Sequence, residues 1–456
     1  MKIDSGGTAW MLTSTALVLL MTPGLAFFYG GMSRAKSVLN MMMMSFVSIA
    51  VVGMAWVVYG YSLTFGDGGG LGSFIGGFGD WGLVGLEDAA TADDGTGVPQ
   101  LVFAAFQATF AIITVALISG AVADRAKFGA WVVFTLVWVT LVYFPIAHWV
   151  WWSDGEDGGK AGWLFELGAL DFAGGTVVHV NAGVAALALV LVLGRRRGWP
   201  KEPMRPHNLP FVLLGAGLLW FGWFGFNAGS ALGAGATAAV AFVNTLAAAC
   251  AAAFAWIVVE KLRDGSSTTL GIASGIVAGL VAVTPACAFV TPLGAIALGL
   301  VAGAACAFAV SLKYRLGYDD SLDVVGVHMV GGIVGALLIG LLATTAVNDA
   351  GADGLLAGGG FALLGKQAVA VLATLVYSFA VTYAIAKVID LVMGFRISDD
   401  DEAAGIDSTA HAETAYDFGT IRAGIGSGAT AAAPAPVSGV SGVSGASGGT
   451  KVEAKG

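Results

Sequence analysis

Long apolar runs alternate with short polar stretches along the first 396 residues of the chain. Eleven of these runs are close to or above the roughly 20 apolar residues that a helix needs to cross a hydrocarbon layer about 30 Å thick. The pattern therefore predicts an all-α polytopic membrane protein with eleven transmembrane helices. The predicted spans are residues 10–31, 39–63, 99–120, 128–150, 173–194, 209–229, 236–258, 270–288, 291–312, 326–346 and 361–393.

The composition agrees with a membrane protein and excludes a soluble globular one. Hydrophobic residues make up 57% of the chain, and charged residues only 11%. The 69 glycines favour helices whose backbones pack closely, because lipid provides no hydrophobic force between helices. No basic patch typical of nucleic-acid binding occurs, and no cysteine or histidine spacing indicates a metal site. We expect no cofactor and, since no catalytic motif such as H-E-x-x-H occurs, no enzyme activity.

Lysine and arginine are distributed unequally between the two sets of loops that eleven spans create. If the N-terminus is outside, fifteen of these residues lie in inner loops or at the inner end of the last span, and three lie outside. The positive-inside rule therefore predicts an outer N-terminus and a C-terminus in the cytoplasm, with the chain in the cytoplasmic membrane. The inner residues are Arg34, Lys36, Arg125, Lys127, Arg195, Arg196, Arg197, Lys201, Arg205, Lys261, Arg263, Lys313, Arg315, Lys387 and Arg396, and the outer ones are Lys2, Lys160 and Lys366.

Two stretches carry an acid and a histidine into runs that are otherwise apolar. Asp171 precedes His179 by eight residues, and Asp320 precedes His328 by the same spacing. Ionisable residues at this depth in a membrane are costly and are functional candidates. Eleven spans divide into five, five and one, so the second half starts from the opposite side, as an inverted repeat followed by a long C-terminal helix. Since eight helical residues rise about 12 Å, both imidazoles are expected near the middle of the membrane.

Six short motifs occur in order along the predicted helices. They are Phe106-QAT-Phe110, Ala147-HWVW-Trp152, Asp171-FAGGTVV-His179, Trp223-FGFNAG-Ser230, VTPAC at residues 283–287, and Asp320-SLDVVGV-His328. Together they resemble the ammonium transporters of the Amt/Mep/Rh family, in particular the bacterial Amt type, over roughly residues 10–420. The resemblance implies transport of ammonium or ammonia by a homotrimer with one pore in each protomer.

The resemblance also implies an outer recruitment site made of Trp151, Phe110, Phe106 and Ser230. A pore that selects a small cation must replace part of its hydration shell, and an aromatic face contributes about 0.5–2 kcal/mol. The Ser230 hydroxyl can accept one N–H. The alternatives are that Trp151 is an interfacial belt tryptophan and that Ser230 caps a helix end.

Two further pairs of residues acquire roles from the resemblance. Phe110 and Phe226 resemble the stacked phenyl gate that blocks the outer mouth, although helical phenylalanines are more often packing residues. His179 and His328 resemble the twin histidines of the pore. If one imidazole bonds the other, one nitrogen must donate and one accept, so the pair can pass a proton along. The alternative is that each is an ordinary bonded helix histidine.

Asp171 has two expected roles. It stands just before a helix, where it can cap the amides of the glycines that follow. Its charge can also attract the arriving cation, which places it among the substrate-binding residues. Asp320 is its counterpart in the second half, and Asp323 is expected to be a cap. His148, at the outer end of the fourth helix, is expected at the surface or at an interface.

The sequence divides into three regions. Residues 1–396 are the predicted transmembrane transporter domain, 397–422 a cytoplasmic regulatory segment, and 423–456 a disordered tail rich in Ala, Gly, Ser and Pro. The resemblance implies that a PII signalling protein docks at the inner face. Its expected contacts are Arg195, Arg196, Arg197, Lys201, Arg205 and residues 399–416.

Two other functions compete with transport. An ammonium sensor on the same scaffold would need a long signalling domain, and only a short tail follows the last span. A membrane oxidoreductase could use His179 and His328 as axial haem ligands. Small residues on both helices draw them together, whereas a haem needs wide space between them.

The loop charges generate a first prediction. Reporter fusions should place the loop at Arg195 to Arg197 in the cytoplasm and the N-terminus outside, because the lysine and arginine bias is fifteen to three. A reporter that places this loop outside the cell would overturn both the topology and the inverted repeat.

Overall fold

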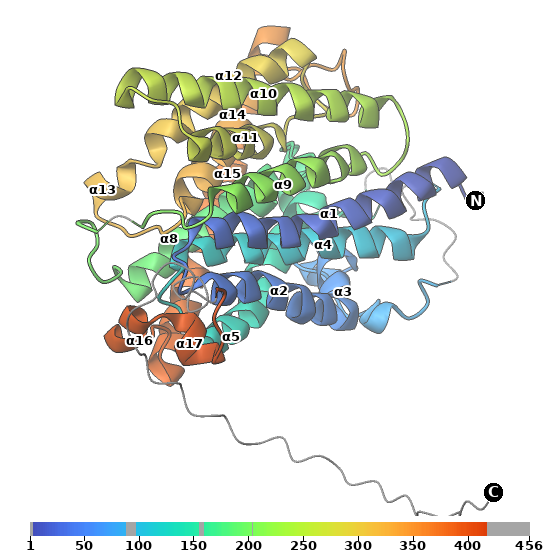
Figure 1. The fold of residues 1–456 in the computed structure, drawn as a ribbon. Coiled ribbons are helices and arrows are strands. Elements are labelled where there is room, and N and C mark those ends of the chain that lie inside the picture. Colours follow the sequence, from blue (N-terminus) through green and yellow to red (C-terminus); the bar gives the residue numbers. More distant parts are fainter. Residues whose placement is uncertain (1–2, 88–96, 155–158, 203, 417–456) are drawn as a thin grey trace, which may run out of the picture. The chain divides into compact units, whose positions relative to one another are not determined.

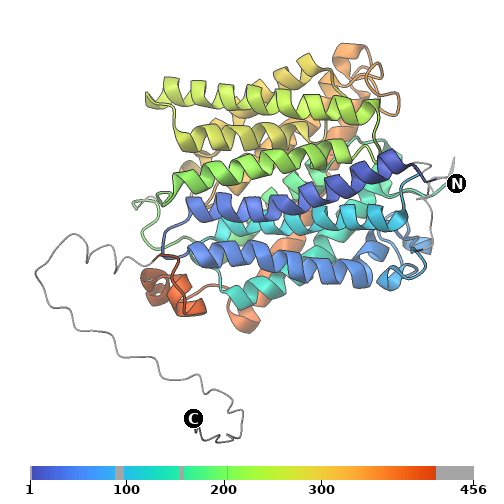
Figure 2. The same cartoon turned by 45° about the vertical axis from the view of Figure 1, so that its right-hand side comes forward.

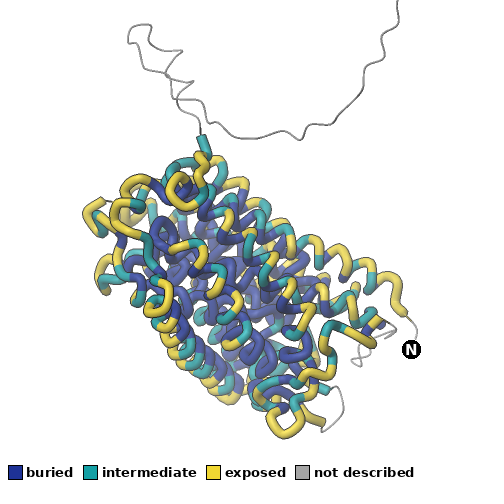
Figure 3. Tube along the Cα trace, turned by 90° about the horizontal axis from the view of Figure 1, so that it is seen from below, coloured by how far each residue is buried: buried dark blue, intermediate teal, exposed yellow. Residues whose placement is uncertain are grey.

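The computed structural model describes residues 3–87, 97–154, 159–202 and 204–416. Within these ranges the chain folds into a bundle of helices with only two isolated β-bridges and no sheet. The long helices lie side by side, as Figures 1 and 2 show from two directions. Buried residues fill the middle of the bundle and exposed ones cover its outside (Figure 3). The predicted all-α fold class is therefore confirmed.

The helices have the following bounds. They are α1 (Ser5–Met32), α2 (Val38–Ala55) continued by η1 (Trp56–Gly60) and α3 (Tyr61–Phe65), α4 (Gln100–Ser119) with η4 (Gly120–Val122), α5 (Phe128–Trp138) continued by η5 (Val139–Tyr143) and α6 (Phe144–Trp151), α7 (Trp163–Leu167), η6 (Gly175–Val180) continued by α8 (Asn181–Leu193), α9 (Leu209–Gly229), α10 (Ala236–Asp264), α11 (Thr269–Val283), α12 (Pro292–Ala309), α13 (Leu312–Leu316), η7 (Val325–Met329) continued by α14 (Val330–Leu342), α15 (Ala362–Met393), α16 (Asp399–Ala404) and α17 (Ile406–His411). Short 3₁₀ turns lie at Gly69–Leu71, Trp81–Leu83 and Leu355–Ala357.

Ten helical segments in the described residues are long and apolar enough to cross a membrane. The eighth predicted span, residues 270–288, is shorter than expected, because α11 ends at Val283 after 15 residues. Pro285 explains the early end, since it has no N–H to bond the carbonyl four residues earlier and its ring clashes with that carbonyl. The chain is a multi-pass membrane protein, and the count of eleven spans stays a prediction.

Glycine lets neighbouring helix backbones approach closely. A Cβ added at Gly299 or Gly303 of α12 would lie within 2.4 Å of a carbonyl oxygen of α10. A Cβ at Gly215 of α9 would lie 2.3 Å from the Phe28 nitrogen of α1. These contacts confirm the packing expected from the glycine content.

The bundle has two ends, which differ in the helices that begin there. The N-face is the end at which α1 and α4 begin, and the C-face is the end at which they finish. The segment leading into α8 starts at the N-face, where the Trp151 indole donates to the Asp171 carbonyl oxygen. The segment leading into α14 starts at the C-face, where the Ser321 amide donates to the Ala121 carbonyl oxygen. The two helices therefore enter the bundle from opposite ends, as the inverted repeat predicts.

The helices α8 and α14 meet through matched glycines. Gly183 lies four residues after His179, and a Cβ there would be 2.3 Å from the Met329 nitrogen. Gly332 lies four residues after His328, and a Cβ there would be 3.0 Å from the Val180 nitrogen. Each histidine also lies in a π-helical turn, η6 or η7, and such turns are common at functional sites.

A network of ionic groups holds the C-face together. Asp319, which is 1% exposed, accepts bonds from the Arg196 guanidinium at 2.6–3.1 Å and lies 4.0 Å from Arg125. Burial acts to raise the pKa of Asp319, but the two guanidinium groups outweigh it and lower that pKa. Burial lowers the pKa of Arg125 to about 10, so its side chain stays charged at neutral pH.

The segment after α15 packs against this face. Asp407 accepts hydrogen bonds from the amides of Leu39 and Asn40 and so caps the start of α2. Glu402 accepts a hydrogen bond from Arg396 at 2.8 Å, and its carbonyl accepts one from Lys36. Residues 417–422 of the predicted regulatory segment and the predicted disordered tail 423–456 lie outside the described residues.

Candidate functional site

Two phenylalanine rings close the N-face end of a narrow cavity. Phe110 of α4 and Phe226 of α9 stack with ring centroids 4.1 Å apart and planes 27° apart. Both side chains are fully buried. The structure thus brings together the two residues that the sequence predicted as a gate.

Aromatic rings surround the gate on its N-face side. Trp151, at the end of α6, meets Phe110 edge to face with centroids 5.9 Å apart, and Phe106 lies 4.8 Å from Phe110. The half-buried Trp151 indole donates to the Asp171 carbonyl oxygen at 2.9 Å. These protein contacts favour a built aromatic site over the belt alternative for Trp151.

Ser230 stands at the C-terminal end of α9, one turn beyond Phe226. Its hydroxyl donates to the Phe226 carbonyl oxygen at 2.8 Å, which is the helix-end bond that the alternative interpretation predicts. The oxygen keeps a lone pair that can accept an N–H from a bound cation. A Cβ at the neighbouring Gly229 would lie 3.0 Å from the Phe106 ring, so Ser230 and Phe106 lie at the same level.

Asp171 caps the helix that carries His179. Its carboxylate accepts bonds from the amides of Gly174, Gly175, Thr176 and Val177 at 2.6–3.2 Å, and from the Thr176 hydroxyl. Burial raises the pKa of Asp171, and the bonds from Thr176 act in the opposite direction. The expected cap is confirmed. Because both oxygens are already occupied, any part of Asp171 in substrate binding acts through its charge, and that part stays a prediction.

The two histidines meet inside the bundle. His179 and His328 are 1% and 3% exposed, and their Nδ1 atoms lie 3.4 Å apart. A neutral imidazole has one N–H, so one ring donates through Nδ1 while the other accepts. His179 also stacks on Trp223, with centroids 5.4 Å apart. The Nε2 atom of His179 is buried and has no hydrogen-bond partner among the described residues, which leaves it free for a small polar guest.

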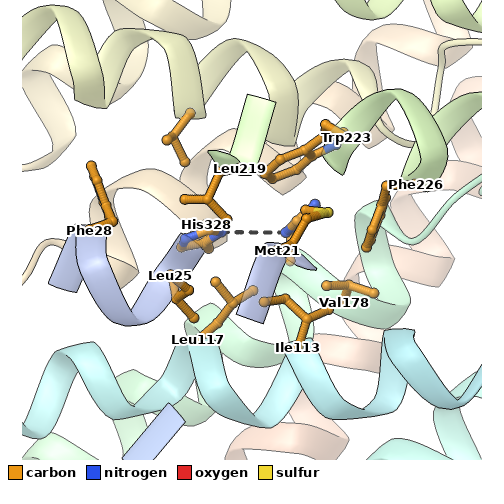
Figure 4. Close-up of a pocket in the computed structure, with 12 residues that line it drawn as sticks. Met21, Leu25, Phe28, Ile113, Leu117, Val178, Leu219, Trp223, Phe226 and His328 are labelled. Atoms are coloured by element: carbon orange, nitrogen blue, oxygen red, sulfur yellow. Dashed lines mark hydrogen bonds between the residues drawn. The ribbon is translucent and has the colours of Figure 1, made fainter. Parts of the chain in front are cut away.

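The cavity around the histidines is narrow and mainly apolar. Its volume is about 10 Å³, which is about the space for one water. Figure 4 shows it extending from Phe226 past His328 to Phe28. The lining residues are Met21, Leu25, Phe28, Ile113, Leu117, Val178, His179, Leu219, Trp223, Phe226, Val277 and His328. The imidazoles provide the cavity's hydrogen-bonding groups.

A second small cavity continues toward the C-face. It shares Phe28, Val277 and His328 with the first and adds Tyr29, Met32, Ser274, Leu322, Asp323 and Val327. Asp320 caps η7 through the amides of Val324 and Val325, at the same offsets of four and five residues as Asp171 uses.

Two expectations from the sequence were wrong. Asp323 is not a cap, because its side chain accepts a hydrogen bond from the Lys313 ammonium at 2.7 Å. His148 is not at the surface but fully buried, with its ring nitrogens 2.8 Å and 2.6 Å from the carbonyl oxygens of Thr64 and Gly72. The partner of Asp323 lies ten residues earlier, in α13. The partners of His148 lie 84 and 76 residues earlier, in α3 and in the loop after it, where the local pattern does not place them.

Trp223 is the wall residue that sequence reasoning missed. It opens one of the quoted motifs but received no role of its own. The available signal was its position three residues before Phe226, which puts both rings on one face of α9.

Comparison with known proteins gives a consistent result. The model of the Ammonium Transporter Family matches residues 9–416. The ammonium transporter of Mycobacterium tuberculosis is 56% identical, covering 91% of each chain, and that of Bacillus subtilis is 49% identical over 91% of this chain and 99% of its own. The crystal structure of Candida albicans Mep2 superposes with a TM-score of 0.80 at 36% identity, covering 88% of each chain. A structure described as a sensor Amt protein gives 0.80 at 27% identity, over 89% of this chain and 98% of its own.

Proposed function

The chain belongs to the ammonium transporter family, and on that premise we propose a mechanism in which ammonium gives up a proton near the gate and crosses as ammonia. The observation that carries the proposal is the pair of imidazoles, whose Nδ1 atoms lie 3.4 Å apart in an otherwise apolar cavity of about 10 Å³. The named relatives are transporters, which agrees with a protein that is not an enzyme.

Desolvation decides which species can pass. A bare ammonium ion in an apolar, water-sized cavity lacks several kcal/mol of hydration energy, since each unsatisfied charge is costly to bury. A cation–π contact with an aromatic face offsets only about 0.5–2 kcal/mol of this lost hydration energy. Ammonia carries no charge and needs one or two hydrogen-bond partners, which the imidazoles supply. Neutral passage is therefore the low-energy route.

Recruitment precedes deprotonation. The rings of Trp151 and Phe106 and the free lone pair of Ser230 lie around Phe110 on the N-face side. This arrangement suits a monovalent cation that can offer N–H groups and sit over a ring. Asp171, whose backbone carbonyl accepts the bond from the Trp151 indole, adds an attractive field through its buried charge, without direct contact. We assign these residues to the substrate-binding vestibule.

The proton takes a separate route from the nitrogen. In the proposed step an N–H bond of ammonium breaks near the gate, and ammonia moves past Phe110 and Phe226. The released proton then passes to the imidazole pair, where the Nδ1 to Nδ1 contact allows transfer from His179 to His328. Ammonia and proton recombine on the far side, so transport carries net positive charge. Potassium has no proton to give and is excluded.

The haem alternative does not fit the histidines. Axial ligation places the iron and its porphyrin between two histidine nitrogens. Here the Nδ1 atoms face each other at 3.4 Å, the ring centroids are 5.4 Å apart, and the cavity has room for about one water. The sensor alternative has weaker support than transport, because the sensor structure is 27% identical whereas the named transporters reach 49–56%.

We also propose the setting of the pore. The chain lies in the cytoplasmic membrane as a homotrimer with one pore in each protomer, and the N-face is outside. The C-face then carries the docking site for a PII protein. Its exposed cations include Arg195, Arg197, Lys201 and Arg205, whereas Arg196 is buried on Asp319 and is unavailable for docking. Residues 397–416 of the regulatory segment lie at the same face, through Lys36 and α2.

The vestibule gives a prediction for Trp151→Leu. The half-saturating ammonium concentration should rise roughly 2- to 30-fold, because the lost cation–π face is worth about 0.5–2 kcal/mol of binding. Current against ammonium concentration in proteoliposomes measures it, with Trp149→Leu as a neighbouring tryptophan control. An unchanged concentration dependence removes the recruitment role, and loss of the folded assembly supports the belt interpretation.

The imidazole pair gives a second prediction. His179→Ala and His328→Ala should each reduce ammonium-driven current by roughly 5- to 150-fold, the effect of losing a buried hydrogen-bonding partner. His328→Glu should admit potassium by supplying a fixed counter-charge. His207→Ala is the control and should conduct like the unmodified protein, because His207 lies between α8 and α9 and is not among the residues that line either cavity. Undiminished current and unchanged selectivity in both alanine variants would refute the relay.

The C-face gives a third prediction. The full chain should co-purify with a PII homologue under nitrogen excess, and removal of residues 399–456 should weaken that association. Binding of the homologue to neither protein would contradict the docking proposal.

A further inference from the structure

The chain between α11 and α12 is irregular, although it lies deep in the bundle. Residues 284–290 are all buried and follow the end of α11 at Val283. Buried irregular backbone is rare because its polar groups need partners. Asn244 supplies two of them, donating to the carbonyl oxygens of Cys287 and Val290 at 2.7 Å. The segment is therefore a built feature of the fold.

This segment touches both walls of the pore. Pro285 packs on η6, since a Cβ at Gly175 would lie 2.4 Å from the proline ring. Thr284 faces the other wall, where the Trp223 indole donates to its hydroxyl oxygen at 2.8 Å. That hydroxyl in turn donates to the Leu280 carbonyl oxygen at 2.7 Å. The indole N–H, the Thr284 hydroxyl and the Leu280 carbonyl therefore all have hydrogen-bond partners.

The bond controls how Trp223 faces the cavity. Tryptophan has a single donor and no acceptor, so the bond to Thr284 uses its whole hydrogen-bonding capacity. The ring lines the cavity (Figure 4). It stacks on His179, with ring centroids 5.4 Å apart and planes 22° apart. With its N–H directed to Thr284, the indole offers the cavity only an apolar face. The imidazoles are then the polar groups that a passing molecule meets.

We infer that Thr284 is a positioning residue that fixes the Trp223 wall and so limits the size of the molecule that passes. The inference rests on the proposed function. Without the hydroxyl, the indole loses its anchor, can tilt away from His179, and exposes a donor to the cavity. The flux of a larger amine such as methylammonium then rises relative to the flux of ammonium.

The chain offers a matched control. Thr245 of α10 is also fully buried, accepts a bond from the Asn227 amide at 2.9 Å and donates to the Ala241 carbonyl oxygen at 2.6 Å. The donor Asn227 is not among the residues that line the cavity. Thr245→Val therefore removes the same kind of hydroxyl without touching a wall residue.

The experiment measures methylammonium flux relative to ammonium flux in proteoliposomes, after size-exclusion chromatography has verified assembly. Thr284→Val should raise the ratio roughly fivefold, the scale set by one unpaired buried donor. Thr284→Ser, which keeps the hydroxyl, and Thr245→Val should both leave the ratio within about twofold of the unmodified protein. In a Trp223→Phe background, which has no indole N–H, Thr284→Val should change the ratio no further.

Three results would overturn the inference: an unchanged ratio in Thr284→Val, an equal change in Thr245→Val, or an undiminished effect in the Trp223→Phe background. Thr284→Ala, judged by the same ratio, replaces the valine variant if that protein does not assemble. If neither assembles while Thr284→Ser does, the hydroxyl serves folding and the inference is wrong. An unmodified protein without ammonium flux refutes the proposed function itself, and selective flux in that protein with no effect of Thr284 refutes only this inference.

Discussion

The close contact between α8 and α14 is the constraint on which the pore depends. Glycine at positions 183 and 332 removes the side chains that would otherwise meet the Met329 and Val180 backbones. Each glycine lies one turn after a histidine, so the same contact that joins the helices also brings the two Nδ1 atoms to 3.4 Å. Lipid provides no hydrophobic force to hold helices together, and small residues are the usual means of close packing in a membrane. The same two glycines therefore allow the helices to pack closely and place the two histidines next to each other.

The surrounding structure secures this contact from both ends. Asp171 and Asp320 bond the free amides of η6 and η7 at matching offsets, so each histidine-bearing turn is anchored where it enters the bundle. The two anchors differ in strength, because Asp171 receives five hydrogen bonds and its counterpart receives two among the described residues. Beside this contact, Thr284, the first residue after α11, accepts a hydrogen bond from the Trp223 indole. Buried polar bonds therefore hold both histidine-bearing turns and the Trp223 ring beside the cavity.

Much of this could be predicted from the sequence, and the misses have a common cause. Apolar run length located the spans, and the repeated acid-to-histidine spacing indicated two helices that meet from opposite ends. The gate pair Phe110 and Phe226 came from the family motif, since neither ring differs from a packing residue in pattern alone. The bonds of His148 to the carbonyls of Thr64 and Gly72, and of Trp223 to a threonine 61 residues later, depend on tertiary contacts that no local pattern encodes. The position of Pro285 was visible, but its effect on the length of α11 was underestimated.

Under the proposed mechanism, only a species able to give up a proton passes the histidine cavity with net charge movement. Simultaneous recording of current and ammonium uptake by the purified protein in liposomes tests it most directly, with ammonium and potassium gradients of equal size applied in turn. The account predicts uptake together with inward positive current under the ammonium gradient, and neither uptake nor current under potassium. A potassium current comparable to the ammonium current would contradict it, because a mainly apolar cavity of this size cannot replace the hydration of an ion that keeps its charge.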